Sequence, residues 1–248
     1  MIEVRDLFKT LGAQPVLKGV TFQIEKGESV VIIGRSGGGK SVLLKHLIGL
    51  LQPDSGSVLI EGEDLTGKSE RQLLGVRQKF GMLFQGAALF DSMTVAENVG
   101  FALRRIQKCS EAQIRAKVSD ALGMVELDGI EDKKPAELSG GMRKRVGLAR
   151  AIVYEPEIVL YDEPTTGLDP IVADSIDRLI INVRERLKVT SVAVTHDMRS
   201  AGRIAQRILM LHQGKIRFAG TPEETFKSTD PVVHRFVNGI SDPKEHYF

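Results

Sequence analysis

The stretch "ESVVIIGRSGGGKSVLLKHL", residues 28–47, decides the fold of this chain. Residues 28–34 form an apolar run that predicts a buried strand, and residues 40–51 predict a buried helix, which Pro53 and Gly56 would stop. Between them, "GRSGGGKS" matches the G-x-x-x-x-G-K-[ST] pattern of a phosphate-binding loop. A strand, a glycine loop and a helix in this order favour an α/β fold built on a parallel sheet.

The glycine loop has the features that bind a phosphate chain. Its glycines let the backbone curl so that several N–H groups point at one anion, and the following helix adds the positive end of its dipole. We expect Lys40 to reach the β- and γ-phosphates of a nucleotide and the Ser41 hydroxyl to ligate Mg²⁺. A glycine turn without a ligand is the disfavoured alternative. The predicted nucleotide-binding residues are Gly34, Arg35, Ser36, Gly37, Gly38, Gly39, Lys40, Ser41 and Val42.

A second motif, "IVLYDEP" at 158–164, ends an apolar strand in two carboxylates. Such a strand places them at the carboxyl edge of the sheet, where α/β proteins bind ligands. We expect Asp162 to hold Mg²⁺ through water and Glu163 to polarise the water that attacks the γ-phosphate. Two solvated acids at a strand end would explain the motif equally well in isolation, but the glycine loop favours the catalytic interpretation.

Strand patterns recur later in the chain. Residues 57–62 and 190–197 predict strands, and residues 208–220 predict a hairpin that turns at Gln213 and Gly214. This alternation with helical patterns supports the parallel sheet.

The middle of the chain predicts a helical lobe over residues 90–155. Thr94 with Glu97, and Ser110 with Gln113, each have the spacing of a capping box at a helix start. The lobe would therefore interrupt the strands of the sheet.

Composition limits the class of protein. Of the 248 residues, 42% are hydrophobic and 27% are charged, which is typical of a globular chain with a real core. The net charge of +2 gives no global field for nucleic acid, so we expect no nucleic-acid partner. The single cysteine, Cys109, favours a reducing cytoplasm, and no apolar stretch reaches the roughly 20 residues that cross a bilayer.

Six motifs in a fixed order give the chain a family resemblance. They are GRSGGGKS (34–41), the glutamine of LFQGAALF (Gln85), LSGGM (138–142), YDEP (161–164), GLDP (167–170) and the histidine of VTHD (His196). This set resembles the ATP-binding cassette (ABC) ATPase subunit of transporters over nearly the whole chain. Glycine loops occur in many ATPases, whereas the Ser-Gly-Gly signature ahead of the Asp-Glu strand is far more specific.

The resemblance implies a P-loop NTPase fold with a RecA-like core, an antiparallel β subdomain and an inserted α-helical subdomain. In this single ABC ATPase domain, residues 1–89 and 156–225 would form the nucleotide-binding core with its β subdomain. Residues 90–155 would form the helical subdomain with the signature motif, and residues 226–248 a C-terminal tail.

The resemblance also implies catalytic roles at matching positions. Gln85 would contact Mg²⁺ or the attacking water, and His196 would contact the γ-phosphate. Together with Lys40 and Glu163 they are the expected catalytic residues. The expected metal-binding residues are Ser41, Gln85 and Asp162, and the cofactors are ATP and Mg²⁺.

The same resemblance implies a role for the second glycine motif, residues 138–142. Ser139 is a good N-cap, and Gly140 and Gly141 permit close approach to an anion. In a head-to-tail homodimer around two ATP molecules, these residues of one copy would hold the γ-phosphate bound by the other. Asp169 would serve the dimer seam, and it would also cap the helix that begins with Pro170.

Departures from the common family pattern point to a branch. Leu11 occupies the position where many relatives stack an aromatic ring on adenine, so we expect apolar packing by Leu11 or Val16 instead. Met142 replaces a common glutamine, and Val42 replaces a common threonine. The surrounding segments are similar to the Mla-type ATPases that drive MCE-linked phospholipid traffic in the Gram-negative envelope.

The branch implies partners and a location. They are an integral membrane permease, an MCE-domain protein and a STAS-domain regulator, with the ATPase at the cytoplasmic face of the inner membrane. An ABC ATPase for another small solute remains an alternative, as does a soluble ABC protein that acts on ribosomes or DNA.

Two local interpretations stay open. The basic run 143–145 is more often a solvated helix face than a set of ligands. Leu89, Phe90 and Met93 belong either to the core of the helical lobe or to a surface that contacts the permease.

Overall fold

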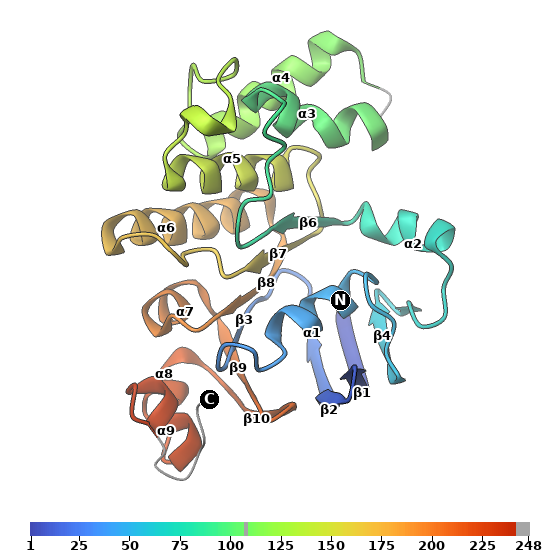
Figure 1. Ribbon diagram of the computed structural model, residues 1–248, viewed down its shortest axis with the longest axis vertical. Helices are drawn as coiled ribbons and strands as arrows, with labels where there is room; N and C mark the ends of the chain where they lie inside the picture. The colour runs from blue at the N-terminus through green and yellow to red at the C-terminus, as the bar shows by residue number, and fades with distance from the viewer. Residues whose placement is uncertain (107–108, 242–248) are drawn as a thin grey trace.

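The computed structural model describes residues 1–106 and 109–241, and these residues form two sheets with helices around them (Figure 1). The smaller sheet has the strand order β2-β1-β4-β5 and is antiparallel throughout. Its strands are β1 (Ile2–Leu11), β2 (Gln14–Ile24), β4 (Ser55–Ile60) and β5 (Glu63–Asp64).

The larger sheet has the order β10-β9-β3-β8-β7-β6. Its strands are β3 (Ser29–Ile33), β6 (Phe80–Leu83), β7 (Ile158–Asp162), β8 (Thr190–Thr195), β9 (Arg207–His212) and β10 (Lys215–Gly220). All neighbours pair in parallel except β10, which returns antiparallel to β9. The carboxyl ends of β3, β7 and β8 therefore meet at one edge, which is where α/β sheets bind ligands.

The helices of the described residues connect or follow the strands. They are α1 (Lys40–Leu47), α2 (Glu70–Arg77), α3 (Val95–Ile106), α4 (Glu111–Met124), the 3-10 turn η1 (Pro135–Glu137), α5 (Gly140–Ile152), α6 (Pro170–Leu187), α7 (Met198–Ile204), α8 (Pro222–Phe226) and α9 (Pro231–Val237). Helices α3, α4 and α5 pack on one another, and α5 also packs on β6 and α6. In Figure 1 this group lies at the top, far from α1 and the smaller sheet.

The buried strand β3 faces two cores. Val31 and Ile33 pack with the cluster that extends into α3, α4, α5 and α6. Val30 and Ile32 pack with the cluster that includes α1 and the smaller sheet. Successive side chains of a strand point to opposite faces, so a central strand covered on both sides becomes apolar at every position. This explains the uninterrupted run that the sequence displays.

Several local predictions are confirmed. Thr94 with Glu97 and Ser110 with Gln113 form both hydrogen bonds of a capping box. The β9–β10 hairpin turns through Gln213 (φ 48°) and Gly214 (φ 80°).

The extent of the first helix is a correction. Helix α1 ends at Leu47, whereas the apolar pattern extends to residue 51. Gly49 adopts φ 65°, and the N–H groups of Leu50 and Leu51 bond back to the carbonyl of Lys45, so the chain leaves the helix well before Pro53.

The proposed division into subdomains stays a prediction. Residues 107–108 of its helical part and 242–248 of its tail lie outside the described residues. Within the described part of the chain, no helix has the length and apolar character to span a bilayer.

Candidate functional site

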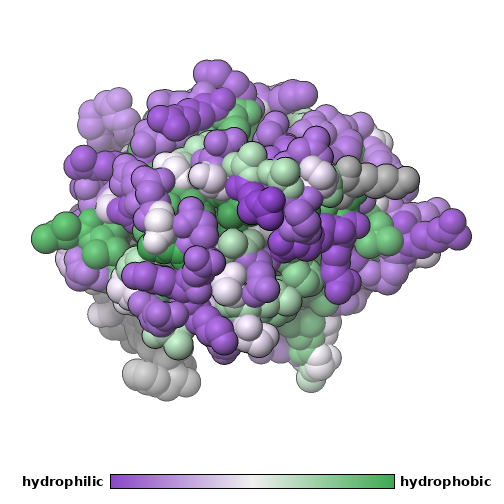
Figure 2. All heavy atoms as spheres, turned by 90° about the horizontal axis from the view of Figure 1, so that it is seen from above, coloured by the Kyte–Doolittle hydropathy of each residue, from purple (hydrophilic) through white to green (hydrophobic). Residues whose placement is uncertain are grey.

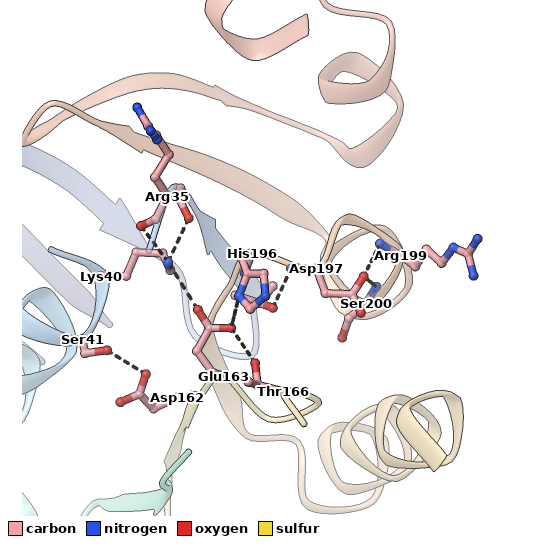
Figure 3. A network of polar contacts seen from close by, with 12 residues as sticks. Arg35, Lys40, Ser41, Asp162, Glu163, Thr166, His196, Asp197, Arg199 and Ser200 are labelled. Carbon is pink, nitrogen blue, oxygen red and sulfur yellow. Dashed lines mark hydrogen bonds and ion pairs between the residues drawn. The ribbon is translucent and has the colours of Figure 1, made fainter. Parts of the chain in front are cut away.

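A cleft of about 500 Å³ opens where the glycine loop meets the carboxyl ends of the central strands. Predicted site residues from four segments line it: Ser36, Gly37, Gly39, Lys40, Ser41, Val42, Gln85, Glu163 and His196. Leu11 and Val16, the expected neighbours of adenine, line it as well, together with Gln14 and Thr166. Segments far apart in the sequence thus contribute to one site, and Figure 3 shows its polar centre.

The glycine loop is held by close backbone approaches. A Cβ at Gly34 would lie 2.4 Å from the carbonyl oxygen of Leu211, and one at Gly39 would lie 2.9 Å from Cγ1 of Val16. Gly39 also adopts φ 99°, a conformation that L side chains rarely adopt. Helix α1 begins immediately afterwards at Lys40, so its N-terminal N–H groups face the cleft.

Lys40 is buried among oxygen atoms. Its Nζ donates to the carbonyl oxygens of Gly34 (2.8 Å) and Arg35 (3.1 Å), and it lies 3.3 Å from Oε1 of Glu163. An ammonium group is costly to bury unless such partners surround it. The loop therefore folds its cation toward the place where phosphate oxygens would enter (Figure 3).

Glu163 joins the two sides of the cleft. While Oε1 faces Lys40, Oε2 lies 2.9 Å from Nδ1 of His196 and accepts a hydrogen bond from Thr166 Oγ1 at 3.1 Å. The backbone of Glu163 adopts φ 49°, which costs about 1–3 kcal/mol for a residue other than glycine. Strain of this kind persists where the surrounding structure over-determines a residue, and it clusters at functional sites.

The oxygen atoms suited to Mg²⁺ lie on the other side of the cleft. Ser41 Oγ donates to Asp162 Oδ1 at 2.9 Å, and Gln85 lines the same cleft. Hard oxygen donors in small number fit Mg²⁺, which commonly completes its shell with water and substrate phosphate. Residues 1–106 and 109–241 contain no cluster of three His, Cys, Asp or Glu side chains arranged for a metal.

The signature loop lies elsewhere. Ser139 caps α5 by accepting a hydrogen bond from the N–H of Met142 at 3.2 Å. Ser139, Gly140, Gly141 and Asp169 are absent from the described lining of the cleft. Figure 1 places α5 on the far side of β7 from α1. The chain alone does not bring its two glycine loops together.

Asp169 has the capping role that the sequence predicts. Its Oδ1 accepts hydrogen bonds from the N–H groups of Ile171 and Val172, both at 3.0 Å, and Pro170 is the first residue of α6. Gly141 sits close to this helix, because a Cβ there would lie 2.7 Å from Cγ1 of Val172. The signature loop and the start of α6 are therefore packed together.

The basic run 143–145 is not simply a solvated face. Arg143 is exposed, but Lys144 is only 5% exposed and donates from Nζ to the carbonyl oxygen of Glu163 at 3.1 Å. Burial lowers the pKa of Lys144, although the charges of Asp162 and Glu163 oppose this shift. Arg145 donates to Ser175 on α6 at 2.6 Å. The interpretation as a solvated face is wrong for Lys144, because tertiary packing buries it against β7.

Sequence reasoning also missed Arg150. Its guanidinium donates to the carbonyl oxygens of Ala87 and Ala88, each at 2.7 Å. These two alanines adopt φ 60° and 49°, two and three residues after Gln85. Nothing in the spacing of the motif signals this link, which depends on how α5 packs on β6.

The segment around Gln85 presents part of its apolar surface to solvent. Phe84 and Phe90 are 37% and 43% exposed, whereas Leu89 and Met93 are half-buried. The Phe90 ring lies 4.9 Å from that of Phe101, centroid to centroid. The face seen in Figure 2, which looks onto the helical layer, has hydrophobic patches among hydrophilic side chains. Leu89 therefore packs partly in the core of the helical lobe, Phe90 is exposed, and contact with a permease stays a prediction.

Comparisons with known proteins agree with this geometry. Residues 17–166 match the family described as "ABC transporter". The chain is 44% identical to "Protein TRIGALACTOSYLDIACYLGLYCEROL 3, chloroplastic" of Arabidopsis thaliana, over 100% of this chain and 76% of that protein. It is also 44% identical to "Probable ribonucleotide transport ATP-binding protein mkl" of Mycobacterium leprae, over 96% of this chain and 69% of that protein.

A solved structure resembles the whole architecture. It is a dimeric, post-hydrolysis state of an ATP-binding cassette bound to ADP and Pi. The TM-score is 0.83 at 32% identity, and the match covers 90% of this chain and 99% of that one. This likeness confirms the predicted fold class.

Proposed function

Since the chain belongs to the ABC transporter family and is an ATPase that takes ATP with Mg²⁺, we propose that its cleft is half of a nucleotide site completed by a second copy. The observation that supports this most is the bonded group beside the glycine loop, in which the buried Lys40 and Glu163 meet the exposed His196. This group combines a cation that can bind phosphate, Lys40, with a carboxylate that can orient water, Glu163.

The proposed chemistry assigns one task to each group. Lys40 and the N–H groups of the glycine loop bind the phosphate chain, and Ser41 and Asp162 hold Mg²⁺, which offsets the negative charge on it. Glu163 orients the attacking water once phosphate draws Lys40 away from it. His196 steadies the γ-phosphate, and Gln85 contacts the metal or the water.

The second half of the site would come from a partner copy. Ser139, Gly140 and Gly141 have an anion-binding helix start but lie outside the cleft of their own chain. The related cassette bound to ADP and Pi is a dimer. A head-to-tail arrangement would place each signature loop over the nucleotide of the other chain.

A complementation experiment tests the shared site. Every site of a Ser139→Arg dimer lacks an intact signature loop, and every site of a Lys40→Met dimer lacks the lysine. Each variant alone should therefore lose ATP turnover. Mixing them should restore up to about a quarter of the parent rate, because half of random dimers would contain one complete site. Failure to recover, or loss of ATP binding by Ser139→Arg monomers, would contradict the shared site.

We further propose that the ATPase drives a membrane permease in phospholipid traffic, from the cytoplasmic face of the inner membrane. The Mla-type segments support this cargo, and so does the Arabidopsis relative, whose name is that of a galactolipid. An MCE-domain protein and a STAS-domain regulator belong to the proposed complex.

The permease would contact the surface formed by Phe84 and Phe90. These exposed rings follow the strand that leads to Gln85, and Arg150 holds the turn between them. Contact there would be transmitted to the cleft through Gln85.

Reconstitution separates the possible cargoes. The ATPase should co-purify with a membrane protein, and the complex in vesicles should move a fluorescent phospholipid only with ATP. The ribonucleotide named for the Mycobacterium relative is the second candidate, as a representative small solute. Turnover stimulated by such a solute, without lipid transfer, would favour that alternative. Co-purification with ribosomes or DNA would contradict both.

A further inference from the structure

Helix α5 joins parts of the molecule that act at different nucleotide sites. Its first residue, Gly140, belongs to the signature loop, which faces a partner's ATP under the proposed function. Lys144 lies four residues later, about one helical turn from that start. Its Nζ bonds to the backbone of Glu163, the carboxylate of its own chain's site.

The backbone of Glu163 is held at both of its polar groups. Its N–H donates to the carbonyl oxygen of Val194 in β8 at 2.9 Å. Its carbonyl oxygen accepts from Lys144 Nζ at 3.1 Å and from the N–H of Thr166 at 3.3 Å. The next residue is Pro164, which disfavours a helical conformation at Glu163, so these contacts maintain the left-handed conformation. Lys144 is the one side chain among these three contacts.

Packing by itself does not call for a lysine at this position. A methionine would fill similar space without the cost of burying an ammonium group. The neighbouring charges of Asp162 and Glu163 oppose the lowering of the Lys144 pKa by burial. The hydrogen bond of Lys144 fixes the peptide that carries the Glu163 side chain, so a small movement of α5 would shift that carboxylate.

We propose that Lys144 is a positioning residue that ties the signature loop to Glu163 of the same chain. Engagement of a partner's γ-phosphate at the start of α5 thereby sets the carboxylate at the chain's own site. This inference rests on the shared site proposed above. It adds the contact through which phosphate binding at one nucleotide site changes the position of Glu163 at the other.

Substitution of Lys144 should separate positioning from binding. Lys144→Met should lower kcat about 10- to 100-fold, because small misplacement of a reacting group is costly. The affinity of the isolated chain for ATP should change less than about twofold, since Lys144 does not line the cleft. The Hill coefficient for ATP should fall toward one. Lys144→Gln retains N–H donors and should recover part of kcat. Lys117→Met, at a half-buried position of α4 where the lysine pairs with Glu155, should match the parent.

Mixed dimers show on which site Lys144 acts. In the pair of Ser139→Arg and Lys40→Met chains, the complete site uses Glu163 of the Ser139→Arg chain. Adding Lys144→Met to that chain should lower the recovered rate about tenfold or more, while adding it to the Lys40→Met chain should lower it far less. A chain that merely misfolds would fail in both placements.

The outcomes distinguish the two proposals. The starting pair should recover less than a quarter of the parent rate, because the signature loop of the Ser139→Arg chain engages no phosphate and leaves its own Glu163 unset. Absence of any ATP-dependent dimer in that pair would overturn the shared site itself. Recovery with equal losses in both placements would overturn the role of Lys144 at its own chain's Glu163. Parent-like kcat and Hill coefficient in both Lys144→Met and Lys144→Gln would overturn it as well.

Discussion

The glycine loop of the cleft and the signature loop both lie at helix starts, yet they differ in the contacts that their side chains make. In the cleft, Lys40 and Glu163 are 5% and 7% exposed and pair with each other. At the signature loop, Ser139 is exposed, and within the described part of the chain its side chain accepts the cap bond from the N–H of Met142 and makes no other hydrogen bond. In the cleft, the charges of Lys40 and Glu163 pair with each other, whereas Ser139 at the start of α5 is exposed to solvent.

This contrast indicates a division of labour. A buried, mutually bonded group can orient a reaction without a partner, because its geometry is fixed in advance. An open helix start gains its partner only when a second surface approaches it. Under the proposed shared site, assembly of two chains would therefore control ATP turnover.

The largest effect should come from removing the charge at the centre of the cleft. Glu163→Gln should lower kcat by about 10²- to 10⁴-fold, the range expected when a general base is lost. ATP binding should persist, so the variant should accumulate as a closed dimer in light scattering with ATP. Glu185→Gln, exposed on α6, is the matched control. Normal turnover by Glu163→Gln would remove the catalytic role from this residue.

The signature loop can be disturbed without touching the cleft. In Gly141→Ala, the added methyl group would lie 2.7 Å from Cγ1 of Val172, so the start of α5 must shift against α6. We expect ATP turnover to fall about tenfold while nucleotide affinity of the monomer is kept.

Rescue and control variants sharpen this test. Gly141→Ala with Val172→Ala should recover most of the rate, because the second change removes the clash. Gly75→Ala, which has open space around it, should match the parent. If the double variant does not recover, the contact with Val172 is not the cause of the lost ATP turnover.

A pH-dependent hydrogen bond joins α6, which begins beside the signature loop, to α7, which follows His196. Asp177 on α6 accepts a hydrogen bond from Ser200 on α7, the helix that follows His196. Burial raises the pKa of Asp177 from 3.8 to about 6, against the opposing effects of Ser200 and Arg203. The folded chain thus binds this proton more tightly than the unfolded chain does, so stability falls as the pH rises from about 4 to about 6.

Asp177→Asn removes that dependence. Relative to the parent, its free energy of unfolding should rise between pH 4 and pH 6 by up to about 3 kcal/mol, the equivalent of two pKa units. The gain should level off above pH 6. Denaturant unfolding across this range measures it, and curves that stay parallel for the two proteins would contradict the assignment.

The smallest effect on the isolated chain should come from the exposed rings near Gln85. Phe90→Ser should change stability by about 1 kcal/mol, through its contact with Phe101, and leave basal ATP turnover intact. Stimulation by the permease should be lost. Phe226→Ser is the matched control, because Phe226 is 44% exposed on α8, at the opposite end of the molecule (Figure 1). Equal stimulation of both variants would place the permease elsewhere.

The sequence by itself determined the local chemistry. The glycine loop, the Asp162-Glu163 strand end and the caps at Ser139 and Asp169 depend on neighbouring residues, and the structure forms each of these local features. The apolar run of β3 likewise predicted a buried strand, and every position of β3 is buried. Local geometry fixes these features, so a pattern of residues suffices to predict them.

Only the tertiary structure decided how distant segments meet. It ended α1 at Leu47, placed His196 against Glu163, and buried Lys144 against a carbonyl group 19 residues away along the chain. A basic residue on a helix can be solvated or buried, and its neighbours in sequence are the same in both cases. The difference arises from which surface the helix packs against, and this depends on the whole arrangement of strands and helices.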